Sequence, residues 1–102
     1  MKIINQSDFE NEIKEGVVLV DFFATWCGPC RMMGAILEEV DKEIEGKAKI
    51  VKIDVDQNQD LAKRFGVMSI PTLILFKNGQ MVQKSVGVMQ KNQCVDLIKK
   101  SL

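Results

Sequence analysis

The chain has no histidine and only three cysteines, two prolines and one tryptophan among its 102 residues. A small and odd number of cysteines excludes the disulfide framework that is typical of small secreted domains. The 14 basic residues balance the 14 acidic residues, so no net charge attracts the protein to nucleic acid or to an anionic membrane. We therefore expect neither nucleic acid nor a membrane among its partners.

The N-terminal segment also lacks the apolar core of a signal peptide, because "MKIINQSDFENEIKEG" contains acids and amides throughout. This predicts a cytoplasmic protein. Internal repeats, low-complexity tracts and Pro/Ser-rich linkers are absent too, and helical and strand patterns alternate at short spacing. The sequence therefore predicts a single α/β domain over residues 1–102, a length at which a domain buries roughly 60 to 70% of its unfolded surface.

The hydrophobic pattern predicts five strands and four helices. Strands are expected at Lys2–Ile4, Val17–Phe23, Lys49–Val55, Pro71–Phe76 and Met81–Val86, and helices at Ser7–Glu15, from Cys27 to Gly46, Asn58–Phe65 and Lys91–Leu102. The nearly continuous apolar run Val17–Phe23 predicts a strand buried on both faces in the middle of a sheet. A capping box of Ser7 and Glu10 is expected to open the first helix, and Asn58 to cap the third. Asn78-Gly79 predicts a hairpin between the last two strands.

The segment "TWCGPC" follows the buried strand and contains two cysteines three positions apart. Cys27 is expected at the start of the long helix and Cys30 in its first turn, so the two sulfurs lie on the same side, within reach of a disulfide. Free backbone N–H groups and the positive end of the helix dipole favour a thiolate on Cys27, which is therefore the better nucleophile. Gly28 allows the turn, and Pro29 suits the first helical position because it has no N–H to leave unpaired.

Such a pair of cysteines suits a metal site, a structural crosslink or redox exchange. A self-contained zinc or iron–sulfur site needs four ligands, whereas this chain has no histidine and only one further cysteine, the distant Cys94. A disulfide that closes so short a loop removes little chain entropy, which makes a purely structural crosslink a poor explanation. Redox exchange is the chemistry that remains, and it requires neither a metal nor a cofactor.

The whole chain resembles the thioredoxin family. The resemblance is carried by "DFFATWCGPC", "KIDVDQN", "FGVMSIPT", "LILFKNGQ" and "VG", which occur in that order. An isolated CxxC is weak evidence, but WCGPC between a buried strand and a helix, with Ile-Pro-Thr about forty residues further on, is specific. The resemblance implies the thioredoxin fold, with a central mixed five-stranded sheet and about four flanking helices.

The same resemblance implies that the protein reduces protein disulfides. Cys27 would attack a substrate disulfide, and Cys30 would resolve the mixed disulfide that forms. A thioredoxin reductase would then reduce the resulting Cys27–Cys30 disulfide. The implied partners are this reductase and disulfide-containing proteins, and the implied protein is a monomer.

Asp21 lies within the apolar strand and shares a face with Leu19 and Phe23, where a carboxylate is costly unless it is protonated or paired. Burial is expected to raise its pKa. An exposed acid on an edge strand is the alternative, and the apolar residues on both sides argue against it. The resemblance implies that Asp21 assists proton transfer with Cys30. Lys52 matches the family's lysine near this acid, although a lysine in a strand is more often a surface residue.

Trp26, Ile70, Pro71 and Gly87 are expected to form one substrate-contact patch. Trp26 is a large aromatic residue beside a reactive cysteine in a turn, which favours an apolar contact surface over a core position. The resemblance implies a cis Ile70–Pro71 bond that packs against the cysteines, where the plainer interpretation is a proline at a strand edge. It also implies that Gly87 lets a substrate backbone approach, rather than only ending a strand.

The chain departs from the family pattern near the site, with Phe23 in place of the usual tryptophan and Gly34-Ala35 in place of the usual Ala-Pro. The long helix thus lacks the proline that ordinarily bends it. Met68 is expected near the contact patch. Cys94 lies on the apolar face of the last helix and is expected to be an inert core thiol.

Two other functions suit the same family. A disulfide-forming or isomerising relative would favour a histidine between the cysteines and an oxidising compartment, and the sequence indicates neither. A binding module or processivity subunit, gated by its redox state, is the alternative from a different class. Retention of the partner's function by a variant without both cysteines would favour that module. A general cytosolic disulfide reductase is the leading hypothesis.

Overall fold

The computed structural model describes residues 1–102, and its centre is a five-stranded sheet of order β1-β3-β2-β4-β5. Its strands are β1 (Lys2–Ile3), β2 (Val17–Phe23), β3 (Lys49–Asp54), β4 (Thr72–Lys77) and β5 (Gln80–Val86), and its helices are η1 (Gln6–Asp8), α1 (Phe9–Ile13), α2 (Gly28–Ile44), α3 (Gln59–Arg64) and α4 (Lys91–Ser101). β3 pairs in parallel with β1 and β2, whereas β4 pairs antiparallel with β2 and β5. The predicted mixed sheet with helices on both faces is confirmed.

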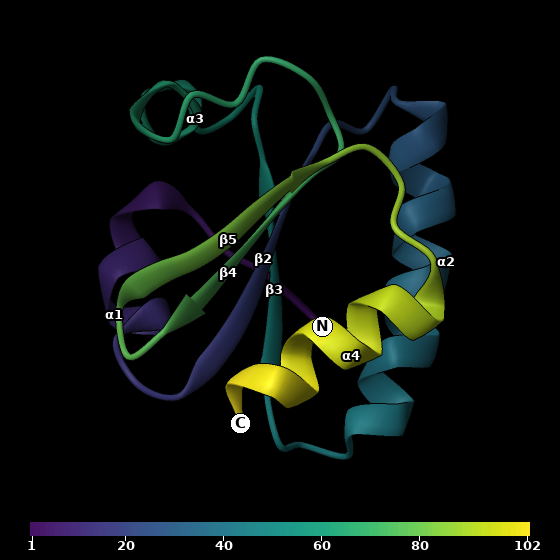
Figure 1. The fold of residues 1–102 in the computed structure, drawn as a ribbon. Coiled ribbons are helices and arrows are strands. Elements are labelled where there is room, and N and C mark those ends of the chain that lie inside the picture. The colour runs from purple at the N-terminus through teal and green to yellow at the C-terminus, as the bar shows by residue number, and fades with distance from the viewer.

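β2 lies in the middle of the sheet, and all seven of its residues are buried, as the apolar run predicts. Val17 and Leu19 belong to a core cluster with residues of α2 and α4, whereas Val18, Val20 and Phe22 pack in a second cluster with residues of α1 and α3. Figure 1 shows these two pairs of helices on opposite sides of the sheet. The period of two along β2 therefore supplies both halves of the core.

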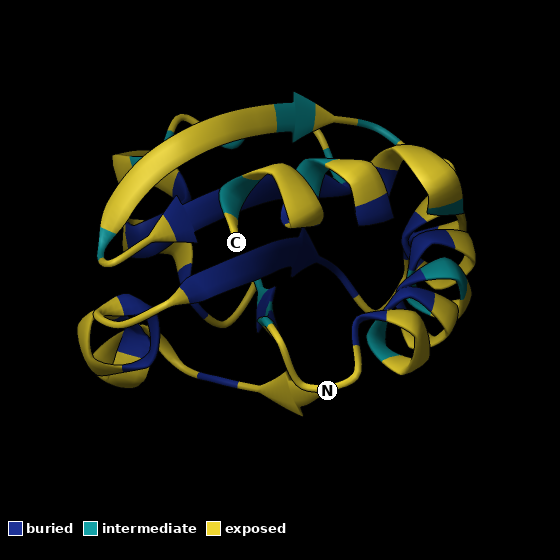
Figure 2. Ribbon diagram, turned by 60° about the horizontal axis from the view of Figure 1, so that its bottom comes forward, coloured by how far each residue is buried: buried dark blue, intermediate teal, exposed yellow.

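β4 and β5 form the predicted hairpin through Asn78 and Gly79, which both have positive φ values, of 50° and 84°. Such angles suit a two-residue turn whose twist matches the strands, and asparagine and glycine adopt them most readily. β5 pairs with β4 only and is almost entirely exposed, as the long yellow strand of Figure 2 shows. A register shift opposite Leu75 and Phe76 interrupts the ladder of this edge.

The start of the first helix differs from the prediction. The chain enters α1 through a turn of 3-10 helix at Gln6–Asp8, and neither preceding residue makes a side-chain capping bond. The predicted capping box of Ser7 and Glu10 is therefore wrong. The Glu10 carboxylate instead pairs with Arg64 at the end of α3, which is a partner that local sequence does not reveal.

Asn58 precedes α3, as predicted, but its side chain does not cap that helix. Its Oδ1 accepts a hydrogen bond from the Gln6 backbone N–H at 2.7 Å, and its Nδ2 donates to the Asp54 carbonyl at 2.8 Å. The first turn of α3 is satisfied by Gln6 in return, because its Oε1 accepts from the Leu61 N–H at 3.2 Å. The two amide side chains thus fasten α3 to the segment that leads into α1.

Asn58→Ala should lower the free energy of unfolding by about 2 kcal/mol, because it removes the partly buried hydrogen bonds to the Gln6 N–H and the Asp54 carbonyl and leaves a gap at a buried position. Asn58 is only 2% exposed, so water does not readily replace the lost amide. Asn92→Ala, at an exposed position of α4, is the matched control and should change stability by less than about 0.5 kcal/mol. Urea unfolding curves of the two variants provide the test, and equal midpoints would contradict this account of Asn58.

Candidate active site

The cysteine pair lies where β2 gives way to α2. Cys27 is the N-cap residue with extended backbone angles, and it forms a disulfide with Cys30 across a Cα–Cα distance of 5.2 Å. The Cys30 backbone N–H donates to the Cys27 Sγ at 3.2 Å, so the sulfur lies at one of the free donors of the helix N-terminus. Gly28 is the first helical residue and Pro29 the second, one position later than predicted. Pro29 still lacks an N–H where an intrahelical acceptor is absent.

Both cysteines are buried, with exposed fractions of 5% for Cys27 and 3% for Cys30. They pack with Phe23, Ala24, Val55 and Ile70. The Cys27 Sγ lies 3.9 Å from the Ile70 carbonyl oxygen. The Ile70–Pro71 peptide bond is cis. The Gly87 N–H donates to the Pro71 carbonyl at 2.8 Å, so Gly87 is bonded to the residue that follows Ile70.

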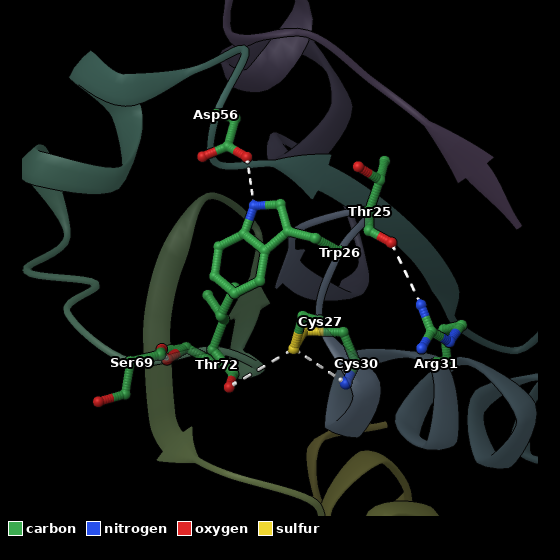
Figure 3. Close-up of a disulfide and its surroundings, with 9 residues drawn as sticks. Thr25, Trp26, Cys27, Cys30, Arg31, Asp56, Ser69 and Thr72 are labelled. Carbon is green, nitrogen blue, oxygen red and sulfur yellow. Dashed lines mark hydrogen bonds between the residues drawn. A yellow bond between two sulfur atoms is a disulfide. The ribbon is translucent and has the colours of Figure 1, made fainter.

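Trp26 is 68% exposed and lies beside the disulfide (Figure 3). Its Nε1–H donates to the Asp56 Oδ2 at 2.8 Å, which holds the indole across the mouth of the site. Sequence reasoning did not assign Asp56 to the site. The parallel pairing of β2 and β3 could have indicated it, because this pairing brings the segments that follow both strands to the same edge of the sheet.

Met68 lies two positions before Ile70 and is 95% exposed. On the other side of the disulfide, Arg31 Nη1 donates to the Thr25 carbonyl at 3.4 Å, which Figure 3 also shows. A large exposed methionine in this loop provides an adaptable apolar surface.

Asp21 is completely buried, and neither of its carboxylate oxygens has a hydrogen-bond partner. In the sheet it lies between Lys52 of β3 and Leu73 of β4. Burial raises the pKa of Asp21 from 3.8 to about 6, and the positive charge of Lys52 opposes this rise. The predicted direction of the pKa shift agrees with this value.

The ammonium of Lys52 lies 4.6 Å from the centroid of the Phe23 ring, in a cation–π contact. Gly34 of α2 also lies near this ammonium, since an added Cβ there would be 3.4 Å from the Lys52 Nζ. Both departures from the family pattern therefore contact the same lysine. α2 continues without interruption through Gly34 and Ala35.

Cys94 is the free cysteine, and it is completely buried in the cluster under α4. Burial raises the pKa of its thiol to about 11, and the negative charge of Asp21 adds to the rise. A thiol in these surroundings forms little thiolate near neutral pH, which agrees with the expected inert core residue.

The structure has no cluster of three or more His, Cys, Asp or Glu side chains able to hold a metal ion. None of its helices combines the length and apolarity that crossing a membrane requires.

A disulfide at a helix N-terminus with a cis-proline loop beside it is typical of proteins that carry out thiol–disulfide exchange. The family model described as Thioredoxin matches residues 1–100. The chain is 52% identical to the thioredoxin of Bacillus subtilis over the full length of both, and 50% identical to that of Staphylococcus aureus over 97% of this chain and 95% of the relative. The chain belongs to the thioredoxin family and is a thiol–disulfide oxidoreductase.

Solved structures agree with this assignment. The thioredoxin of Fasciola hepatica superposes with a TM-score of 0.88 at 34% identity, with complete coverage of both chains. A mutant thioredoxin of Halobacterium salinarum gives a TM-score of 0.89 at 37% identity, covering 99% of this chain and 88% of the other.

Asp21→Asn should stabilise the protein near neutral pH. Below the usual pKa of 3.8 the folded and unfolded forms are both protonated, so the ionisation of the carboxyl group does not affect stability. As the pH rises towards the folded pKa of about 6, the unfolded chain releases its proton first and stability falls, by roughly 3 kcal/mol in total. The variant should therefore have the higher urea midpoint near neutral pH and lose that advantage in acid. Asp96→Asn, at an exposed position, is the control, and an identical pH profile for both variants would refute the assignment.

Cys94 should resist alkylation in the reduced native protein. Iodoacetamide at mildly alkaline pH should modify Cys27 and leave Cys94 unmodified, because the Cys94 thiol is buried and its pKa is about 11. Mass spectrometry of peptides from native and urea-denatured samples distinguishes the two sites. Modification of Cys94 at a rate similar to that of Cys27, in protein that remains folded, would contradict this result.

Proposed function

We propose that this protein is a general cytosolic protein disulfide reductase in which Cys27 is the nucleophile and Cys30 the resolving thiol. The observation that carries the proposal is the bond from the Cys30 N–H to the Cys27 Sγ at the N-terminus of α2. In the reduced protein this donor and the helix dipole favour a thiolate on Cys27.

The reaction transfers two electrons in two exchange steps. The Cys27 thiolate attacks one sulfur of a substrate disulfide, so an S–S bond forms between protein and substrate, and the other substrate sulfur leaves as a thiolate. The Cys30 thiolate then attacks the Cys27 Sγ, which forms the Cys27–Cys30 disulfide and releases the second substrate thiolate. The substrate is reduced and the protein is oxidised. A thioredoxin reductase returns the pair to the dithiol.

Cys30 must lose its proton before it attacks, and we assign the acceptor role to Asp21. Its pKa of about 6 suits a group that accepts and returns a proton near neutral pH. A water molecule would connect the carboxylate to the Cys30 Sγ. Lys52, whose ammonium lies near Phe23 and Gly34, supports the charged form of Asp21.

The substrate contact patch consists of Trp26, Ile70, Pro71 and Gly87. Its support is the Ile70 carbonyl at the Cys27 sulfur, the bond from the Gly87 N–H to the Pro71 carbonyl, and the exposed indole of Trp26 next to Cys27 in the chain. An extended substrate segment would place its disulfide at Cys27 and its backbone along the cis-proline loop. Gly28 and Pro29 support the site by shaping the turn between the cysteines.

The remaining assignments follow from this chemistry. Residues 1–102 act as one domain and as a monomer, with disulfide-containing proteins as substrates and without metal or cofactor. A disulfide reductase works where thiols are kept reduced, which favours the cytoplasm. The balance of 14 basic and 14 acidic residues supports the absence of nucleic acid and membrane partners.

Cys27→Ser should abolish disulfide reduction, because no other thiol is positioned to begin the attack. Cys30→Ser should retain the attack and accumulate mixed disulfides, since the resolving thiol is gone. Insulin reduction measured by turbidity tests the activity, and mass spectrometry of captured complexes identifies the linked cysteine. Cys94→Ala is the control and should keep nearly full activity. Trapping by Cys27→Ser rather than by Cys30→Ser would reverse the two roles.

A further inference from the structure

Lys84 lies on the exposed edge strand β5, yet its ammonium has two defined acceptors. Its Nζ donates to the Phe65 carbonyl at 2.8 Å and to the Gly66 carbonyl at 3.0 Å. Lys84 pairs with Ile74 of β4, and Ile74 belongs to the core cluster on the α1 and α3 side of the sheet. The lysine therefore projects towards the C-terminal end of α3.

The two acceptors of Lys84 lie at the point where α3 becomes the loop to Pro71. Gly66 has a φ of +63° and its N–H donates to the Lys63 carbonyl, while the Val67 N–H donates to the Ala62 carbonyl at 2.9 Å. This is the Schellman pattern of a helix C-terminus. A cation at this end of a helix is stabilised both by the free carbonyls and by the negative end of the dipole.

The ammonium of Lys84 lies close to Gly66. A Cβ at this position would be 3.4 Å from the Lys84 Nζ, which is near ordinary van der Waals contact. Glycine at this position is therefore favoured by the left-handed backbone, with a φ of +63°, rather than by the lysine.

The residue that follows β5 is bonded to the far end of the same loop. The Gly87 N–H donates to the Pro71 carbonyl at 2.8 Å, three residues beyond Lys84. Within the loop, the Thr72 hydroxyl donates to the Ser69 carbonyl at 2.5 Å. Residues 67–70 thus lie between two attachments, one to Lys84 of β5 and one to Gly87 directly after it, and the Ile70 carbonyl at their end faces the Cys27 sulfur.

We infer that Lys84 is a positioning residue for the cis-proline loop, residues 67–71, and through it for the substrate contacts of Ile70 and Pro71. This inference rests on the proposed substrate patch. Lys84 touches neither the disulfide nor the patch. It fixes the point at which the loop leaves α3, and it thereby limits the conformations that the loop must give up when a substrate segment binds.

The experiment compares Lys84→Met, Lys84→Arg and the control Lys77→Met, which removes an exposed lysine from the neighbouring strand. Lys84→Met keeps a long unbranched side chain, one atom shorter than that of lysine, and removes its donors. We expect the KM for insulin to rise roughly two- to fivefold with an unchanged kcat. The reduction of dithiobis(nitrobenzoate), a small disulfide that does not need the loop, should keep its rate. Lys84→Arg should restore the wild-type KM because it retains a cation with several donors, and Lys77→Met should match the wild type.

Amide hydrogen exchange provides a readout besides activity. In Lys84→Met the amides of Gly66 and Val67 should exchange roughly two- to fivefold faster, with Lys84→Arg close to the wild type. Unchanged exchange in Lys84→Met overturns the inference, as does an equal fall in the rates with insulin and with the small disulfide. Failure of Lys84→Arg to restore both readouts overturns it as well. If the wild type does not reduce insulin, the proposed function fails, while faster exchange in Lys84→Met still supports the positioning of the loop by Lys84.

Discussion

The burial of β2 between a parallel and an antiparallel neighbour is the constraint on which the fold and the site both depend. Its alternate residues fill two cores on opposite faces, and burying one such aliphatic or aromatic side chain contributes roughly 1.5 to 3 kcal/mol. A slip of one residue in the register would exchange the two faces of the strand. Such a slip would move Asp21 to the side of α1 and α3. The register that stabilises the core therefore also determines on which face of the sheet Asp21 lies.

The carboxylate of Asp21 is costly inside this apolar strand, and the positive charge of Lys52 reduces that cost. Asp21 has no hydrogen-bond partner, so the positive charge on β3 is what limits the rise of its pKa. The ammonium of the lysine in turn lies near the Phe23 ring and Gly34. Phenylalanine has no N–H to donate, but its ring face attracts a cation. The two departures from the family pattern, which are distant along the sequence, thus both lie near the side chain whose charge acts on Asp21.

The parts of the molecule that depend on near neighbours were predictable from the sequence. Residues 17–23, the Asn78-Gly79 turn and the Cys27–Cys30 turn carry their signals within a few positions. The cis bond before Pro71 and the role of Gly87 came only from the family resemblance. The capping box at Ser7 failed because the partner of Glu10 is Arg64, and the cap of α3 comes from Gln6, so tertiary contacts replaced the local bonds that the pattern suggested. Asp56 and Lys84 were missed for the same reason, since their partners lie on other elements.

On the exposed edge strand β5, features that protect many sheet edges from association occur together with contacts to the loop beside the redox site. Exposed edge strands commonly carry lysines and irregular pairing, which hinder association with other chains, and β5 has both Lys84 and a register shift. A lysine that served only this purpose would extend into water. Lys84 instead contacts two carbonyls at the C-terminal end of α3, and Gly87, directly after β5, contacts Pro71. Both ends of the cis-proline loop are therefore bonded to β5 or to the residue that follows it. The exposed edge strand is therefore part of the framework of the redox site.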